Sequence, residues 1–346
     1  MATWDHIEIQ TEQGNKVKAQ APLIVSASRS TDIPAFYCDW FFHRMKIGYS
    51  VWRNPFNNSP LYVSYSKVRF IVFWSKNPRP LLPYLDYLKE KRIGCYIQYS
   101  LNDYEDEKLE HGVPKLEERI ETFKLLVDKL GKGGVIWRFD PLMLTPDIDI
   151  DMLLKKIENI GDQLKGYTEK LVFSFADISI YNKVKKNLDK NGINARDWTS
   201  EEMTEFATRL VTLNNEKGWN YKLATCGEAA NLDGIEHNHC IDDELIIRRA
   251  YKDAELMKFL GVSMPDMFTP EEDIITLPNG SRVIKGNNKD TGQRDFCGCM
   301  KSKDIGQYDT CIHGCEYCYA NTSKLSAANH YKCHKANPLA ETITGL

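Results

Sequence analysis

The stretch Arg69-Phe-Ile-Val-Phe-Trp-Ser-Lys-Asn77 is a short run of β-branched and aromatic residues that ends in polar ones. A run of this length and composition predicts a β-strand, here at about 69–74. The polar end, which contains Lys76, then lies at the carboxyl end of that strand. Longer helical patterns flank the stretch, so we expect the strand to belong to an α/β fold.

The same kind of run occurs six more times between Pro22 and Glu228, in alternation with helical patterns. This alternation predicts a parallel sheet, which we interpret as a partial TIM-like (β/α) barrel. Besides the first strand, we expect strands at about 22–28, 49–53, 95–100, 135–139, 171–175 and 221–225.

Two of the intervening helices have clear boundaries in the sequence. Apolar residues at helical spacing extend from Leu116 to Leu130, and Gly131 follows as a stop. A second helix begins at the capping box Thr199-x-x-Glu202 and ends near Gly218.

Polar residues follow each expected strand. In a (β/α) barrel the carboxyl ends of the strands form one face, and that face holds the active site. Ordinary loops are also polar, so each of these residues taken alone is explained as a surface loop residue. As a set they predict one polar bowl, and its candidate catalytic residues are Arg29, Arg53, Lys76, Arg138, Asp140, Asp177 and Glu228.

Charge and hydropathy exclude several classes of protein. The 346 residues include 45 Lys and Arg against 48 Asp and Glu, a formal net charge of -3, which argues against a globally basic nucleic-acid binder. The amino-terminal residues show no export signal, and no apolar run approaches the length of a membrane span. We therefore expect a soluble, cytoplasmic protein.

Cysteines are unevenly distributed along the chain. Seven of the ten lie between Cys226 and Cys318. In a chain without an export signal such crowding favours metal ligation over disulfides. Cys38 and Cys95 lie inside apolar segments, and we expect them to be buried structural thiols.

The motif Cys311-Ile-His-Gly-Cys315-Glu-Tyr-Cys318-Tyr-Ala-Asn321 spaces three cysteines by four and three positions. Four thiolates close a [4Fe-4S] cluster, so three predict a cluster with one iron open. The alternative is a structural zinc ion, which needs a fourth ligand that His313 is able to supply.

This motif resembles that of the radical S-adenosylmethionine (SAM) superfamily, in the form seen in spore photoproduct lyase and its relatives. The resemblance implies that Cys311, Cys315 and Cys318 hold a [4Fe-4S] cluster and that SAM chelates the open iron. It also implies reductive cleavage of SAM to a 5'-deoxyadenosyl radical, with electrons from a partner such as flavodoxin or ferredoxin. The other motif residues assigned to cofactor binding are Tyr317, Tyr319 and Asn321.

The motif stands near the end of the chain, whereas the superfamily carries it after the first strand. One explanation is a cluster appendage that does not touch the barrel. The other is a circularly permuted barrel, with a strand at about 303–310 followed by the cysteine loop and a helix. The permuted barrel accounts for more of these observations. We therefore expect the chain to have three parts: the barrel core (1–228), an irregular cysteine-rich cap over the top of the barrel (229–310), and the cluster loop with the final helix (311–346).

A closer resemblance covers most of the chain. Residues 26–34 (Ser-Ala-Ser-Arg-Ser-Thr-Asp-Ile-Pro), 74–78 (Trp-Ser-Lys-Asn-Pro), 138–141 (Arg-Phe-Asp-Pro) and 304–311 (Asp-Ile-Gly-x-Tyr-x-Thr-Cys) resemble an uncharacterised bacterial family with a domain of unknown function. That family implies no substrate.

Counting the remaining cysteines predicts a second metal site. Its ligands are expected to be Cys226, Cys240, Cys297 and Cys299, with Cys333 as a possible replacement for one of them. We interpret the site as an auxiliary [4Fe-4S] cluster. Zinc held by four cysteines and unrelated thiols are the alternatives.

If the superfamily resemblance holds, the polar bowl binds an unknown small-molecule or peptide substrate, with no role for nucleic acid or membrane. Arg29, Arg53 or Lys76 would bind the SAM carboxylate or an anionic substrate. Asp140, Asp177 and Glu228 would accept hydrogen bonds from SAM or take up protons. The competing functions are a DNA repair enzyme like photoproduct lyase, a non-catalytic electron carrier and a zinc-stabilised binding module.

Overall fold

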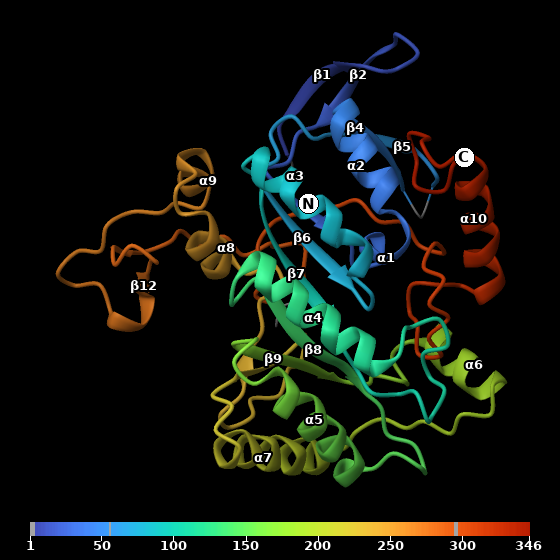
Figure 1. The fold of residues 1–346 in the computed structure, drawn as a ribbon, viewed down its shortest axis with the longest axis vertical. Helices are drawn as coiled ribbons and strands as arrows, with labels where there is room; N and C mark the ends of the chain where they lie inside the picture. The colour runs from blue at the N-terminus through green and yellow to red at the C-terminus, as the bar shows by residue number, and fades with distance from the viewer. Residues whose placement is uncertain (1–3, 55–56, 294–296) are drawn as a thin grey trace.

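The computed structural model describes residues 4–54, 57–293 and 297–346, and its main element is a parallel β-sheet (Figure 1). Every pairing between neighbouring strands of this sheet is parallel. From one edge to the other the eight strands are β14 (Lys303–Asp304), β3 (Ile24–Ala27), β6 (Phe70–Ser75), β7 (Gly94–Ser100), β8 (Val135–Leu142), β9 (Lys170–Phe175), β10 (Lys222–Thr225) and β11 (Glu236–His237).

Six of the seven strands expected from the sequence lie in this sheet, in chain order. The exception is the expected strand at 49–53. It forms as β4 (Tyr49–Arg53), but it pairs with β5 (Pro60–Ser64) in a separate sheet. That sheet is completed by β1 (His6–Gln10) and β2 (Lys16–Gln20), in the order β1-β2-β5-β4.

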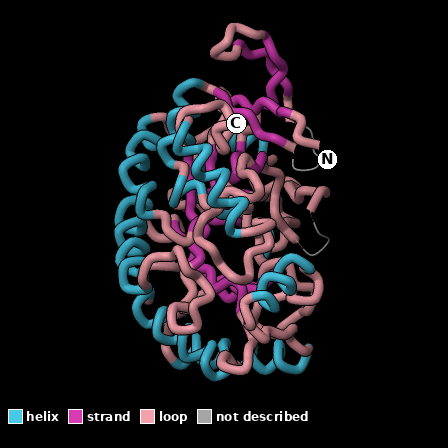
Figure 2. Tube along the Cα trace, turned by 90° about the vertical axis from the view of Figure 1, so that its right-hand side faces the viewer, coloured by secondary structure: helices cyan, strands magenta, loops and turns pink. Residues whose placement is uncertain are grey.

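Helices form an outer layer along one side of the strands (Figure 2). They are α1 (Ile33–Phe36), α2 (Cys38–Ile47), α3 (Leu85–Glu90), α4 (Leu116–Leu130), α5 (Ile150–Leu164), α6 (Asn182–Lys190) and α7 (Ser200–Glu216), with a 3-10 turn η1 (Arg79–Tyr84) before α3. The capping box predicted at Thr199 and Glu202 is confirmed at the start of α7. Within the described part of the chain, no helix is both long and apolar enough to cross a membrane.

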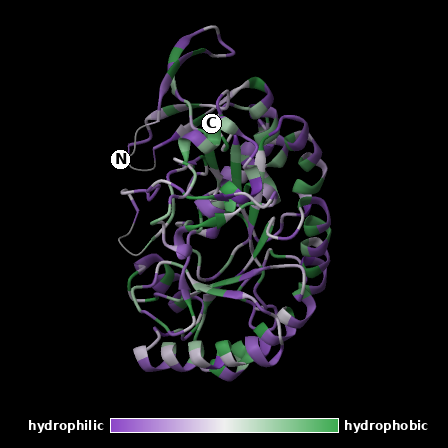
Figure 3. Cartoon of the chain, turned by 90° about the vertical axis from the view of Figure 1, so that its left-hand side faces the viewer, coloured by the Kyte–Doolittle hydropathy of each residue, from purple (hydrophilic) through white to green (hydrophobic). Residues whose placement is uncertain are grey.

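The inner strands of the main sheet, β3 and β6 to β9, are buried on both faces, and their alternate side chains contribute to two different cores. In β6, Ile71 and Phe73 pack with the outer helices, whereas Phe70 and Val72 face the opposite side. Figure 3 shows the apolar strands in the interior and more hydrophilic segments outside them.

The second core is formed by the segment that the sequence predicts to be a cap over the barrel. Its helices are α8 (Asp243–Ala250) and α9 (Ala254–Phe259), and apolar residues of both pack against the face of the sheet opposite the outer helices. The two helices are separate because the Asp253 side chain accepts a hydrogen bond from the Leu256 amide and starts a new helix after α8. Beyond α9 lie a 3-10 turn η2 (Glu271–Asp273) and a small hairpin of β12 (Ile275–Thr276) and β13 (Arg282–Val283).

The chain returns to the main sheet at β14, which pairs with β3. This two-residue strand falls at the start of the strand expected at 303–310. The cysteine motif follows directly, and then comes α10 (Lys324–Ala336), capped by the Ser323 side chain. A strand, a loop and a helix therefore follow one another beside β3.

Candidate functional site

A cavity of about 440 Å³ lies where the parallel strands end. Its lining includes all seven cysteines that the sequence analysis selected as metal ligands: Cys226, Cys240, Cys297, Cys299, Cys311, Cys315 and Cys318. It also includes six of the seven predicted polar strand-end residues, Arg29, Lys76, Arg138, Asp140, Asp177 and Glu228, together with Tyr317 and Tyr319. Chain segments more than 280 residues apart thus meet in one cavity.

Arg53 does not line this cavity, and its expected position at the polar bowl is corrected by the structure. It ends β4 in the four-stranded sheet, where Nη1 donates to the Asn58 carbonyl oxygen at 3.2 Å. A different hollow, formed with residues of the carboxyl-terminal region, lies beside it.

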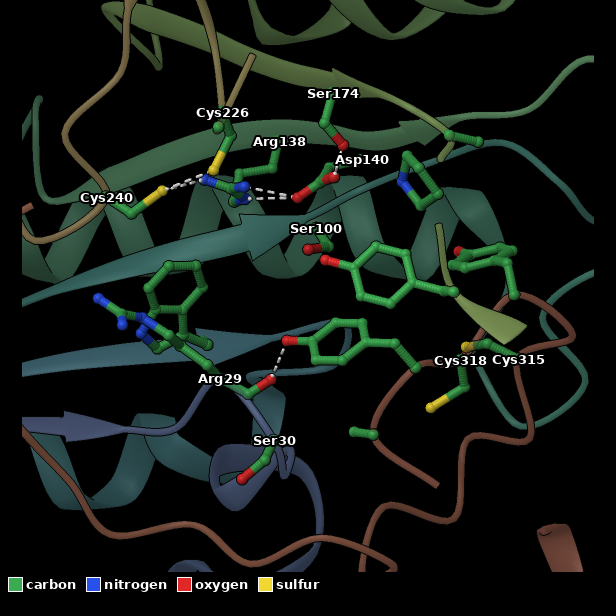
Figure 4. A pocket seen from close by; sticks show the side chains of 18 of the residues that line it. Arg29, Ser30, Ser100, Arg138, Asp140, Ser174, Cys226, Cys240, Cys315 and Cys318 are labelled. Atoms are coloured by element: carbon green, nitrogen blue, oxygen red, sulfur yellow. Dashed lines mark hydrogen bonds and ion pairs between the residues drawn. The ribbon is translucent and has the colours of Figure 1, made fainter. Parts of the chain in front are cut away.

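The two groups of thiols occupy different ends of the cavity. Figure 4 places Cys226 and Cys240 at one end and Cys315 and Cys318 at the other. Ser100 and Asp140 lie between them in that view. All ten cysteines of the chain are free thiols, and Cys38 and Cys95 are buried as expected. Cys333 lies on α10 and is not among the cavity-lining residues.

Hydrogen bonds to the main body of the chain hold the motif loop in place. Asn321 Nδ2 donates to the Cys311 carbonyl oxygen at 2.7 Å, which closes the loop on itself. Cys315 forms a backbone bridge with Glu110. The buried Glu316 carboxylate accepts from Lys324 at 2.5 Å and from Asn191 at 2.7 Å. Glu316 has a structural role that the sequence analysis did not identify.

His313 is not available as a fourth metal ligand in this arrangement. Its Nε2 lies 2.7 Å from an Asp32 carboxylate oxygen, and its Nδ1 lies 3.0 Å from the Gly112 carbonyl oxygen. Both ring nitrogens are therefore already engaged with oxygen atoms of the chain. Zinc at the motif would have to find its fourth ligand elsewhere.

Burial raises the pKa of the three motif thiols, and for Cys311 it raises the pKa to about 12. Iron and zinc bind the thiolate form, so a bound cation would have to stabilise the charge here. Among the described residues, no group of three or more His, Cys, Asp or Glu side chains is arranged to hold a metal ion.

Lys76 reaches the cavity wall, but its ammonium group already has partners. It donates to Glu110 at 2.7 Å and to the Tyr317 hydroxyl at 3.0 Å. Asn102 donates to the same two oxygens. Although burial acts to raise it, Lys76 and Arg119 lower the pKa of Glu110 to about 2. This buried network of ion pairs and hydrogen bonds stabilises the motif loop through Tyr317.

At the other end of the cavity, the second group of thiols is packed closely. Cys226 Sγ and Cys240 Sγ are 3.1 Å apart. Three N–H groups point at sulfur: Arg138 Nη1 and Asn238 Nδ2 lie 3.2 and 3.1 Å from Cys240 Sγ, and the Ile241 amide lies 3.4 Å from Cys299 Sγ. Hydrogen bonds from Cys226 and Cys299 and the charge of Arg138 lower the pKa of Cys240. N–H donors of this kind stabilise thiolates.

Arg138 and Asp140 form an ion pair on β8 between the two groups of thiols. The Arg138 guanidinium donates to one Asp140 oxygen through Nε at 3.2 Å and through Nη2 at 2.5 Å. Ser174 donates to the other oxygen. Glu228, also on the cavity wall, accepts from the Phe175 amide at 3.2 Å. Asp140 and Glu228 are therefore held in fixed orientations.

Arg29 is fixed through its backbone by both neighbouring segments. Its carbonyl oxygen accepts from the Tyr319 hydroxyl at 2.8 Å, and its amide donates to Asp304 at 3.0 Å. The Asp304 carboxylate also accepts from the hydroxyls of Ser26 and Ser28. Asp304 was missed as a functional residue, although it begins one of the sequence stretches that carried the family resemblance.

No curated protein and no solved structure matches this chain. One family model does match, over residues 24–320, and it is described as Domain of unknown function (DUF1848). The matched span runs from β3 through the cysteine motif, so it contains the cavity-lining residues. The chain therefore belongs to the DUF1848 family.

Proposed function

We propose that this protein is a radical SAM enzyme in which Cys311, Cys315 and Cys318 hold a [4Fe-4S] cluster with one open iron. The observation that carries the proposal is the shared cavity: the motif cysteines line the same hollow as the polar ends of the parallel strands. An appendage for electron storage would have no reason to face such a cavity. In a [4Fe-4S] cluster each thiolate binds a different iron, so the sulfur ligands of a cluster lie farther apart than the ligands of a single metal ion.

When bound, the cluster and SAM supply reductive cleavage to methionine and a 5'-deoxyadenosyl radical that abstracts a hydrogen atom from substrate. The chain's own residues position the reactants. Asp140 and Glu228, held by Ser174 and by the Phe175 amide, present fixed acceptors to hydroxyl or amine groups. Tyr317 and Tyr319 narrow the space beside the motif thiols. The electron comes from a reducing partner, such as flavodoxin or ferredoxin.

We further propose that the main sheet is that of a circularly permuted, partial (β/α) barrel. Supporting this, β14, the cysteine loop and α10 follow one another as strand, loop and helix beside β3. In the unpermuted order this unit would come first, with the cluster loop after the first strand. The carboxyl-terminal face of the strands is also where barrel enzymes place their active sites.

The second group of thiols, Cys226, Cys240, Cys297 and Cys299, is proposed to hold another metal group. Sulfur atoms around one tetrahedral zinc are about 3.8 Å apart, because each Zn–S bond is about 2.3 Å long. The 3.1 Å between Cys226 and Cys240 is nearer to that spacing than to the wider spacing around a cluster. That pair alone does not form a zinc site, because no group of three or more such ligands among the described residues is arranged around one ion. We therefore keep the auxiliary [4Fe-4S] cluster as the proposal and zinc as its alternative, and metal analysis separates the two.

The first test is metal content after anaerobic purification. We expect about four irons per chain for the open cluster alone, or about eight if both groups hold clusters. Stoichiometric zinc without iron would refute the enzyme proposal and favour a zinc-stabilised binding module.

The second test is reductive cleavage of SAM. With a strong reductant, the iron-loaded protein should form 5'-deoxyadenosine, and Cys315→Ser should abolish both that product and the open cluster. Cys333→Ser is the matched control, because Cys333 lies outside the cavity, and it should keep both. An iron-loaded, reducible protein that leaves SAM intact would indicate an electron carrier instead.

A further inference from the structure

The cationic groups that line the cavity differ in whether their charge is matched. Three Lys and Arg side chains are described there: Arg29, Lys76 and Arg138. Two of them each pair with a carboxylate, since Lys76 pairs with Glu110 and Arg138 with Asp140. Among the described residues of this cavity, Arg29 is therefore the cation that has no carboxylate partner.

Arg29 has donor capacity that the described residues leave unused. Its Nη1 donates to a neutral amide, Gln293 Oε1, at 3.2 Å. Its Nη2 is buried and has no hydrogen-bond partner in the described part of the chain. The guanidinium lies over the Trp74 ring, 5.6 Å from its centroid. A buried donor without a partner is costly, and a guanidinium fork fits a carboxylate or phosphate.

The nearby carboxylate of Asp304 does not fill this role. Its oxygens accept from Ser26, from Ser28 and from the backbone amides of Arg29 and Gly306. It thus holds the turn that carries Arg29 while the guanidinium extends away. The Tyr319 hydroxyl fixes the same turn from the motif side. The side chain is therefore anchored at its base and has an unsatisfied donor at its tip.

The direction of the side chain indicates which reactant it binds. In Figure 4 Arg29 extends toward the end of the cavity that holds Cys240, away from Cys315 and Cys318. An anion held by its guanidinium lies far from the open iron, so it is not the SAM carboxylate. The cavity of about 440 Å³ has to admit the adenosyl group as well, which leaves room only for a small second molecule.

We propose that Arg29 binds the anionic group of a small organic acid or phosphate ester, the substrate of the radical reaction. The identification of the anion as a substrate rests on the proposed function, whereas the anion site itself does not. The opposing possibility is that Arg29 serves only to balance negative charge on the thiolates of Cys240, Cys297 and Cys299.

The test measures anion binding on the metal-loaded protein as purified. Its thermal unfolding is followed with succinate, with inorganic phosphate and with sodium chloride at equal ionic strength. We expect at least one of the first two anions to raise Tm beyond the chloride control, and Arg29→Gln to weaken that binding by about tenfold or more. Arg53→Gln is the matched control, since Arg53 lies in the other sheet, and it should bind as the wild type does.

Three results would overturn the proposal: no anion dependence in the wild type, an unchanged dependence in Arg29→Gln, or equal losses in Arg29→Gln and Arg53→Gln. A variant Arg29→Lys keeps the charge but not the fork, so partial binding with full metal content supports anion recognition. Loss of metal from Arg29→Gln, without anion dependence in the wild type, assigns the residue to charge balance. SAM cleavage without substrate is measured separately, so a protein that binds the anion but leaves SAM intact refutes only the proposed function.

Discussion

Asp304 shows how a single carboxylate connects the last strand of the sheet to the cavity. It accepts hydrogen bonds from the hydroxyls of Ser26 and Ser28 and from the amides of Arg29 and Gly306. All four donors lie in the two segments that meet at β3 and β14. A carboxylate accepts on both oxygens, whereas an amide presents one oxygen and two hydrogens.

Asp304→Asn should therefore destabilise the protein by about 1–3 kcal/mol, because at least one donor would face an N–H group. Chemical denaturation at pH 7 measures this change. Asp273→Asn, at an exposed position in η2, is the matched control and should alter stability by less than about 0.5 kcal/mol. Equal effects of the two substitutions would show that Asp304 does not join the segments.

Residue roles were the least predictable part of the sequence. The pattern around Arg53 correctly predicts a strand, but spacing along a chain does not tell which sheet the strand joins. Lys76 was expected to bind an anion, and Arg138 was a candidate catalytic residue, but each is paired with a carboxylate. Folding brings Glu110 to Lys76, and no local pattern marks Glu110, whereas Asp140 lies only two positions from Arg138 on β8. The seven cysteines were selected by counting thiols that had no simpler explanation, and all seven line the cavity.

Among the elements, α7 has the most explicit start signal. The Thr199 hydroxyl accepts from the Glu202 amide at 3.2 Å, and the Glu202 side chain accepts from the Thr199 amide at 3.0 Å. Arg196 also donates to Glu202, at 2.6 Å. These hydrogen bonds, that of Arg196 first, lower the pKa of Glu202 to about 2.

The sign of the pH effect follows from that lowered pKa. Glu202 stabilises the folded chain fully above its ordinary pKa of 4.5, and this contribution is lost as the pH falls through about 2. Glu202→Gln should therefore cost less than about 1 kcal/mol at pH 7, since the pair is exposed to solvent, and progressively less below pH 4.5. Unfolding free energies from pH 7 to 2.5 measure the trend. Glu201→Gln, one position away, should show no comparable convergence.

Strands in the middle of the sheet were predictable because burial on both faces leaves a continuous apolar run. The strands β6 to β10 were found in this way, within a few residues of their ends. The two residues of β14 carry no such signal, since Lys303 and Asp304 are both charged. A strand was expected there only because the permuted-barrel interpretation places one directly before the cysteine motif. Three strands of the four-stranded sheet, β1, β2 and β5, were not predicted because they are partly exposed and lack a continuous apolar run.

On the scale of the whole molecule, the proposed metal groups would join parts of the chain that are far apart in sequence. Their ligands come from the residue after β10, from the segment beyond it and from the loop after β14. Any group that binds only the folded chain adds to its stability by mass action.

Removing the metals with a chelator under reducing conditions should therefore lower Tm and open the chain locally. Limited proteolysis should then cut first within the segments 286–293 and 297–323, before the sheet and its outer helices unfold. Mass spectrometry of the early fragments locates these cuts. If cleavage begins in the helical layer instead, the metals do not restrain those segments.

The pairing of β14 with β3 also has a consequence for biosynthesis. A ribosome finishes β3 and its turn long before it makes Lys303, about 280 residues later. Until then the strand edge has no partner, and the loop of Cys311, Cys315 and Cys318 does not exist. Any metal group held by these thiols can therefore form only after Cys318 has been synthesised, and until Lys303 is made the nascent protein carries an unpaired edge that can aggregate or recruit a chaperone.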